Sequence, residues 1–144
     1  MQRQEHTTGI RMNKVILVAL LFMMAGTVTE LYLLDHYEDT LQLIPLLCIG
    51  ASVLTLFILF FQRTKWTMGF FNLVLGLTAL SGVYGAFLHL QANYEFELEM
   101  KPGAKGWELF IESLSGALPS LAPGSMIVLA LIGYSYLILL KQQQ

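Results

Sequence analysis

The sequence predicts an all-α integral membrane protein with four transmembrane helices in an up-down bundle. Its composition predicts a membrane protein, because 56% of the 144 residues are hydrophobic and only 12% are charged. Soluble domains average about 45–50% apolar and about 25% charged residues. Its apolar runs predict the helices, because four of them reach the roughly 20 residues that a spanning helix needs. They cover residues 15–34, 41–61, 67–90 and 123–140, and we expect 1–144 to form one domain.

Charged side chains alternate along the segments outside these runs. Nine of the ten acidic residues lie in segments 30–39 and 95–112, whereas six of the eight Lys and Arg residues lie near the two termini or in segment 62–65. Basic residues concentrate on the cytoplasmic side of membrane proteins. We therefore expect both termini in the cytoplasm of a bacterial inner-membrane protein. The acidic segments, which contain only Lys101 and Lys105 as basic residues, would face the opposite side.

The first run follows Arg11 and Lys14 and resembles the start of a signal peptide. It continues past a weak cleavage motif at Ala25 to Leu34, which predicts an uncleaved signal anchor. A short loop then joins it to the second run, so the two helices should form an antiparallel hairpin.

The second and third runs have recognisable boundaries. Asp39 and Gln42 have the spacing of a capping box, which predicts that the second helix starts there. Pro45 follows within or just after the first turn, where its missing N–H costs little. A tight connection at 62–65 leads to Trp66, a residue type that collects at membrane interfaces.

The connection from 93 to 122 is far longer than a hairpin requires, and we expect it to form an extracytoplasmic cap. Residues 94–100 alternate apolar and acidic side chains, a pattern typical of an extended segment with one apolar face. The alternative is a helical extension of the third run. After a turn at 101–103, apolar residues recur at helical spacing and predict a short amphipathic helix. These residues are Trp107, Phe110, Ile111, Leu114 and Leu118, with Glu108 and Glu112 on the opposite face.

An accessory or structural subunit of a larger membrane complex is the function that this organisation favours. The cap could add a strand to a partner or offer a helix face to it. The residues expected to dock the partner are Tyr94, Phe96, Leu98, Trp107, Phe110, Ile111 and Leu114. Expected partners are membrane lipids and other membrane subunits or further copies of the chain.

A metal- or proton-handling protein, either an enzyme or a transporter, is the alternative. Glu30 lies within an apolar run, and intramembrane carboxylates commonly have a function. Gly26, Thr27 and Glu30 form a small and polar stripe that we expect in a helix interface. His89 follows a small-residue helix face, and His36 lies in the first loop. Glu30, His36 and His89 could together bind a transition metal such as Zn, Fe, Mn or Cu.

Several classes of activity lack support in the sequence. Cys48 is the single cysteine, so the chain alone has no Cys pair for thiol–disulfide chemistry. Phosphate-binding glycine motifs, nucleophile–base arrangements and basic nucleic-acid patches are absent. Nucleotides and nucleic acids are therefore not expected as ligands, and a non-enzymatic role is favoured. No asparagine lies in a glycosylation sequon, which agrees with a bacterial protein.

Overall fold

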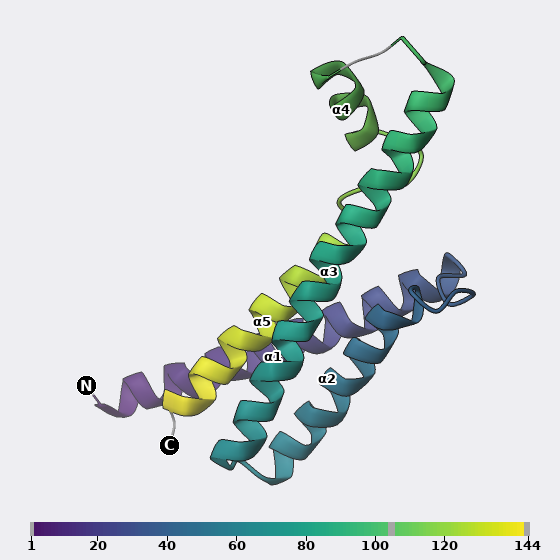
Figure 1. Ribbon diagram of the computed structural model, residues 1–144. Coiled ribbons are helices and arrows are strands. Elements are labelled where there is room, and N and C mark those ends of the chain that lie inside the picture. Colours follow the sequence, from purple (N-terminus) through teal and green to yellow (C-terminus); the bar gives the residue numbers. More distant parts are fainter. Residues whose placement is uncertain (1, 104–105, 143–144) are drawn as a thin grey trace.

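A computed structural model describes residues 2–103 and 106–142, and this part of the chain contains five α-helices and no strand (Figure 1). Lys105 lies outside the described residues. Four of the helices are long and apolar enough to cross a membrane, which confirms the predicted all-helical class. The helices are α1 (Gln2–Leu33), α2 (Leu43–Phe61), α3 (Lys65–Met100), α4 (Trp107–Leu114) and α5 (Gly124–Gln142).

The loop between α1 and α2 contains only part of the predicted capping box. The side chain of Gln42 accepts hydrogen bonds from the backbone N–H groups of Glu38 and Asp39, at 3.0 and 3.2 Å. Asp39, however, uses its carboxylate to accept from the next amide, that of Thr40, at 2.6 Å. Because the aspartate caps its own turn and not the helix, α2 begins at Leu43 and not at residue 41.

Residues 94–100 form the last two turns of α3, so the predicted extended segment is wrong and its helical alternative holds. A single strand without a partner leaves its backbone groups unpaired, whereas a helix satisfies them internally. Side chains support these turns: Gln91 donates to Glu95 at 2.9 Å, and Lys101 lies 3.9 Å from Glu97. Both pairs have the i, i+4 spacing that stabilises helices.

The length of α3 gives the molecule its shape. Its 36 residues correspond to about 54 Å at a rise of about 1.5 Å per residue, whereas the 19 residues of α5 span about 28 Å. The C-terminal part of α3 therefore projects beyond the other long helices and carries α4 at its end (Figure 1). We call residues 89–103 and 106–122 the arm, and the four long helices without it the bundle.

The bundle is built around α3 and α5. Helix α3 packs against α2 and α5, α5 also packs against α1, and α1 touches α2 only sparsely. A Cβ atom added to Gly82 on α3 would lie 2.7 Å from the carbonyl oxygen of Pro123, and one added to Gly133 on α5 would lie 2.5 Å from Leu75. These contacts make α3 and α5 antiparallel and confirm that the small-residue face of α3 admits a close neighbour. All four long helices contribute to the core, which includes Leu20, Met24, Ile49, Leu56, Phe71, Leu75, Leu129 and Leu137.

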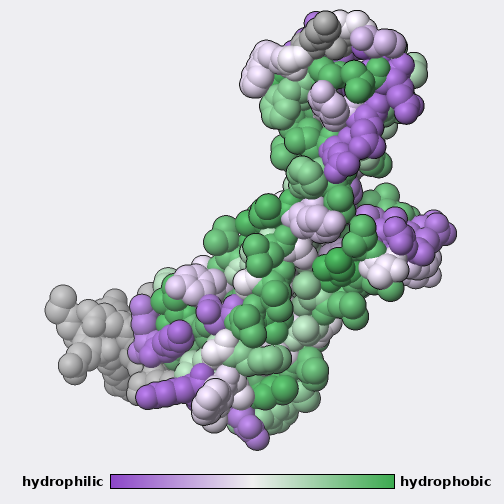
Figure 2. Space-filling view, in the orientation of Figure 1, coloured by the Kyte–Doolittle hydropathy of each residue, from purple (hydrophilic) through white to green (hydrophobic). Residues whose placement is uncertain are grey.

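Apolar side chains also cover the outside of the bundle. Figure 2 shows a largely hydrophobic surface over the four long helices, with hydrophilic residues gathered near their ends and on the arm. Phe22, Leu47 and Phe60 are among the exposed side chains. Such a surface favours aggregation in water. It suits the hydrocarbon of a bilayer, as expected for a multi-pass membrane protein.

Candidate functional site: the arm and the histidine pair at its base

Asn93 attaches the segment after α4 to the side of α3. Its side chain is buried, with only 2% of the residue exposed. The amide nitrogen donates to the carbonyl oxygens of Ser113 and Leu118, at 3.0 and 2.7 Å, and to Ser120 Oγ at 3.0 Å. The amide oxygen accepts from the backbone N–H of Leu118 at 2.9 Å. One asparagine thus satisfies backbone groups on both sides of the turn that follows α4.

Small side chains make room for this network. A Cβ atom on Gly116 would lie 2.5 Å from the side chain of Asn93, so only glycine fits beside the asparagine. Ser113 is fully buried and donates back to the carbonyl of Leu109, at 2.7 Å. The predicted helix to Leu118 therefore stops at Leu114, because the following residues turn to reach Asn93.

The other end of the arm is closed by an ion pair. Lys101 Nζ lies 2.6 Å from Glu112 Oε1, which links the end of α3 to α4. This hydrogen bond raises the pKa of Lys101, and the negative charges of Glu112, Glu97 and Glu108 act in the same direction. Exposed pairs of this kind contribute only about 0–1 kcal/mol. Lys101 and Glu112 therefore orient α4, while Asn93 supplies most of the attachment.

Helix α4 packs against α3 through a side other than its predicted apolar face. Leu109 and Ser113 are the buried residues of α4. The predicted apolar face is exposed, and Trp107 leaves 72% of its surface uncovered. The rings of Trp107 and Phe110 lie 5.3 Å apart, so they form one aromatic patch. The remaining residues of this face, Ile111, Leu114 and Leu118, are also exposed.

The three docking candidates on α3 are exposed as well. Tyr94, Phe96 and Leu98 lie on the projecting turns of the helix, and Phe96 leaves 51% of its surface uncovered. The arm thus carries all seven predicted docking residues as exposed side chains. No edge strand is available, because this segment is helical.

His36 and His89 meet at the base of the arm. Their ring centroids are 6.2 Å apart in an edge-to-face arrangement, although the residues belong to the α1–α2 loop and to α3. Burial lowers the pKa of His36, and the neighbouring His89 lowers it further. His89 Nδ1 lies 3.2 Å from the carbonyl oxygen of Pro119. A carbonyl only accepts, so Nδ1 carries the proton and the lone pair of a neutral His89 ring is on Nε2.

Glu30 does not complete a metal site with this pair. Among the side chains that the structure describes, which begin at residue 9, no three His, Cys, Asp or Glu lie close enough to hold one metal ion. Glu30 is exposed on α1. Of its predicted stripe, Thr27 is buried, whereas a Cβ on Gly26 would meet no atom within 4 Å. The structure therefore brings together two of the three predicted ligands.

Asn93 is the important residue that the sequence does not reveal directly. Its partners lie 20 to 27 positions later, in a segment with no regular pattern. The available signal is a polar amide one turn beyond His89, together with Gly116 and the serines of the long connection.

No protein-family model matches the chain, and no curated protein or solved structure gives a significant match. The candidate sites therefore depend on this chain's own geometry.

Proposed function

We propose that the protein is a small accessory or structural subunit of a larger complex in the bacterial inner membrane, and that its arm docks a partner. The observation that carries the proposal is an exposed apolar surface on an arm that hydrogen bonds hold in place. Trp107 and Phe110 form its aromatic patch. Large aromatic side chains commonly provide most of the binding energy at interfaces. A preorganised surface also loses less conformational entropy on binding.

The length of α3 supports a position of the arm outside the lipid. A spanning helix needs about 20 residues, so a span that starts near Lys65 leaves the hydrocarbon at about residues 85–90. Acyl chains would then not cover the docking residues on the arm. The helix contacts, in the order α2, α3, α5 and α1, support an up-down bundle. Basic residues on loop 62–65 and near both termini support a cytoplasmic location for that end and an extracytoplasmic arm.

Charges on the arm indicate the chemistry of the partner. Glu95, Glu99 and Glu108 are exposed, whereas Lys101 is paired with Glu112. The apolar docking residues are thus bordered by carboxylates. We infer a partner with an apolar groove and a basic rim, because complementary charges steer association and fix its register.

Photo-crosslinking tests the docking proposal. A photoreactive phenylalanine analogue at Phe110 or Phe96 is expected to form a discrete protein adduct in the native membrane. The same analogue at Phe60, which is exposed on α2 far from the arm, serves as the control and should give no such adduct. Replacing Trp107 with alanine should lower the yield at Phe110 by roughly thirtyfold, since an interface anchor contributes about 2 kcal/mol or more.

The mass of the adduct identifies the partner. Twice the mass of the chain indicates a second copy, and another mass indicates a different subunit. Equal adducts at all three positions, or a yield that Trp107→Ala leaves unchanged, would contradict docking through the arm. Deleting 94–118 gives an independent test, because partners should be lost from the purified protein while membrane insertion persists.

A metal- or proton-handling role is the second candidate, and the histidine pair favours it. With zinc–nitrogen bonds of about 2.0–2.1 Å, two imidazoles on one tetrahedral ion place their ring centroids about 5 Å apart. The observed separation of 6.2 Å is about 1 Å longer, so the two rings would have to move closer together to share one ion. Both rings are suited to ligation, because the lowered pKa of His36 favours its neutral form and the free lone pair of His89 is on Nε2. Water or a partner's side chain would have to complete the coordination.

Metal titration of the purified chain tests this second role. Replacing either His36 or His89 with alanine should weaken Zn²⁺ or Cu²⁺ binding at least about tenfold, since even outer-shell changes cost about 10–100-fold. The third histidine supplies a matched control, His6→Ala. Glu30→Gln should have little effect if the pair binds metal without the carboxylate. Metal binding that survives both His36→Ala and His89→Ala would exclude this site.

A further inference from the structure

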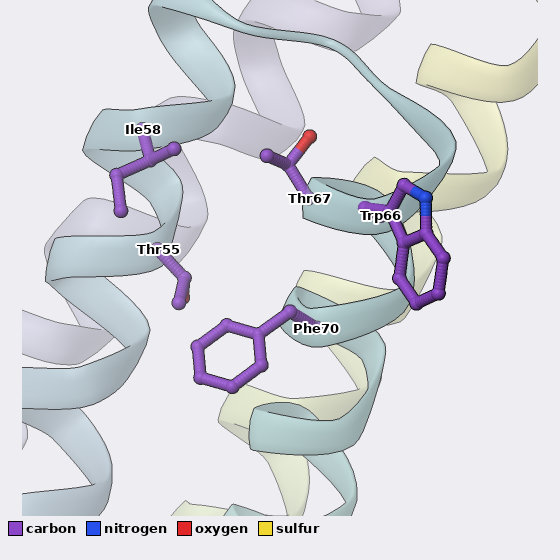
Figure 3. Close-up of a pocket in the computed structure, with 5 residues that line it drawn as sticks. All are labelled: Thr55, Ile58, Trp66, Thr67 and Phe70. Atoms are coloured by element: carbon purple, nitrogen blue, oxygen red, sulfur yellow. The ribbon is translucent and has the colours of Figure 1, made fainter.

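A shallow crevice opens between α2 and α3 at the end of the bundle opposite the arm. Thr55 and Ile58 of α2 and Trp66, Thr67 and Phe70 of α3 line about 280 Å³. Figure 3 shows the ring of Phe70 extending from α3 towards α2, close to Thr55. The volume lies near the lower limit of ligand pockets, which is about 300 Å³. The crevice therefore suits part of a flexible chain better than a bulky ring system.

The walls of the crevice are mainly apolar. Both threonine hydroxyls are already occupied: Thr55 donates to the carbonyls of Ala51 and Ser52, at 2.8 and 3.1 Å, and Thr67 donates to that of Gln62 at 2.7 Å. Ile58 and Phe70 are apolar. Apart from the indole N–H of Trp66, these walls offer a polar ligand little to replace its hydrogen bonds to water, and losing those bonds is costly. An acyl chain makes no hydrogen bonds to water and therefore loses none on entering the crevice.

Basic residues lie beside the mouth of this apolar crevice. Arg63 is exposed on the connection between α2 and α3, and Lys65 is exposed as the first residue of α3, next to the lining residue Trp66. Thr64 and Thr67 form a capping box that fixes the start of α3, with bonds of 3.0 and 3.1 Å. The positive end of the α3 dipole adds to these charges. A negative group at the membrane surface would therefore be attracted here.

We propose that this crevice binds an anionic glycerophospholipid, with one acyl chain between α2 and α3 and its phosphate beside Arg63 and Lys65. The depth fits this arrangement. Thr55 lies six residues before the end of α2, which is about 9 Å along the helix. The apolar lining thus extends from the end of the helix, where a headgroup would lie, into the level of the acyl chains. Trp66 lies at the level of the headgroup, as interfacial tryptophans do.

Fluorescence quenching by brominated lipids in nanodiscs tests the proposal. In a chain with Trp107 replaced by phenylalanine, Trp66 is the only tryptophan. Brominated phosphatidylglycerol should quench it at lower mole fractions than brominated phosphatidylcholine. The preference should be roughly fivefold for each basic residue that contacts the phosphate. High salt should weaken this preference by screening the charges.

Two matched variants separate a lipid site from general surface charge. Lys65→Gln together with Arg63→Gln should abolish the preference. Lys141→Gln should retain it, because Lys141 is exposed in the last turn of α5 and does not line the crevice. Equal quenching by the two lipids, or a preference that is lost only in Lys141→Gln, would overturn the proposal.

A second reporter tests the acyl chain separately. In a Trp66→Phe and Trp107→Phe background, Phe70→Trp places the only tryptophan inside the crevice, and Phe22→Trp places it on the open surface of α1. Phosphatidylglycerol should be preferred by the reporter at residue 70 and not by the one at residue 22. The same response at both positions would show ordinary surrounding lipid and overturn the site.

Discussion

Replacing Asn93 with alanine is expected to detach α4 and the turn after it from α3 while the bundle stays folded. The substitution removes the four hydrogen bonds of the side chain. It leaves the carbonyl and the N–H of Leu118 without their partner, whereas the carbonyl of Ser113 keeps Ser120 Oγ at 3.3 Å. Each buried group left unpaired costs about 1–3 kcal/mol, so we expect a loss of about 3 kcal/mol in the stability of the attached segment.

Hydrogen exchange measures this effect residue by residue. Amides from 109 to 118 should exchange roughly a hundredfold faster in Asn93→Ala, since about 1.4 kcal/mol corresponds to a factor of ten. Gln91→Ala is the matched control, because that side chain is exposed on the same helix and, among the described residues, bonds only to Glu95. Asn93→Asp should be at least as damaging, because its second carboxylate oxygen would face the carbonyl oxygens of Ser113 and Leu118 in a buried position. Unchanged exchange of residue 118 in Asn93→Ala would refute the attachment.

The second large effect is expected where α3 and α5 come closest. In Gly82→Ala, the new methyl group would lie 2.7 Å from the carbonyl oxygen of Pro123 and 3.0 Å from Met126 and Ile127. The nearest atom belongs to the backbone, so the two helices must move apart. Overpacking of this kind costs about 1–3 kcal/mol. We expect a correspondingly lower midpoint in detergent-induced unfolding followed by circular dichroism.

Two other glycines provide controls for this prediction. A Cβ on Gly76 would meet nothing within 4 Å, so Gly76→Ala should be neutral or slightly stabilising through its better helix propensity. Gly133→Ala would meet the flexible end of Leu75, which can change rotamer, and should cost less than Gly82→Ala. If Gly76→Ala were as damaging as Gly82→Ala, close α3–α5 packing would not be the cause.

The two substitutions also distinguish the arm from the bundle. Asn93→Ala should leave the unfolding midpoint of the bundle almost unchanged, because the bundle core contains no residue of the arm. Gly82→Ala should lower that midpoint and leave the network around Asn93 formed until the bundle unfolds.

The long helices could be predicted from sequence because length and hydropathy are local properties. The four apolar runs all lie in helices, although α1 begins at Gln2 and α3 continues to Met100, well beyond the predicted spans 15–34 and 67–90. The start of α2 moved by two residues because Asp39 caps its own turn instead. Residues 94–100 were misassigned because the alternating carboxylates fit a strand as well as they fit the water-exposed sides of a helix. The absence of a partner strand, which favours the helix, is a property of the whole fold.

The candidate sites were less predictable than the helices. Helical spacing predicts which apolar residues share one face of α4, but the face that α4 turns towards α3 depends on Asn93 and on the space left by Gly116. The meeting of His36 with His89 depends on how the α1–α2 loop folds over α3. Neither relation has a fixed spacing in the sequence, since both join segments that are far apart in the chain.

The uninterrupted course of α3 also has a mechanical consequence. One continuous helix joins the loop at Arg63 to the arm, and a helix transmits rotation along its length better than a jointed linker does. A tilt of about 10° about its first turn would move the far end of a helix of about 54 Å by about 9 Å. In the proposed topology the helix would act as a lever, so that a change in lipid or partner contacts at one surface of the membrane would displace Trp107 at the other.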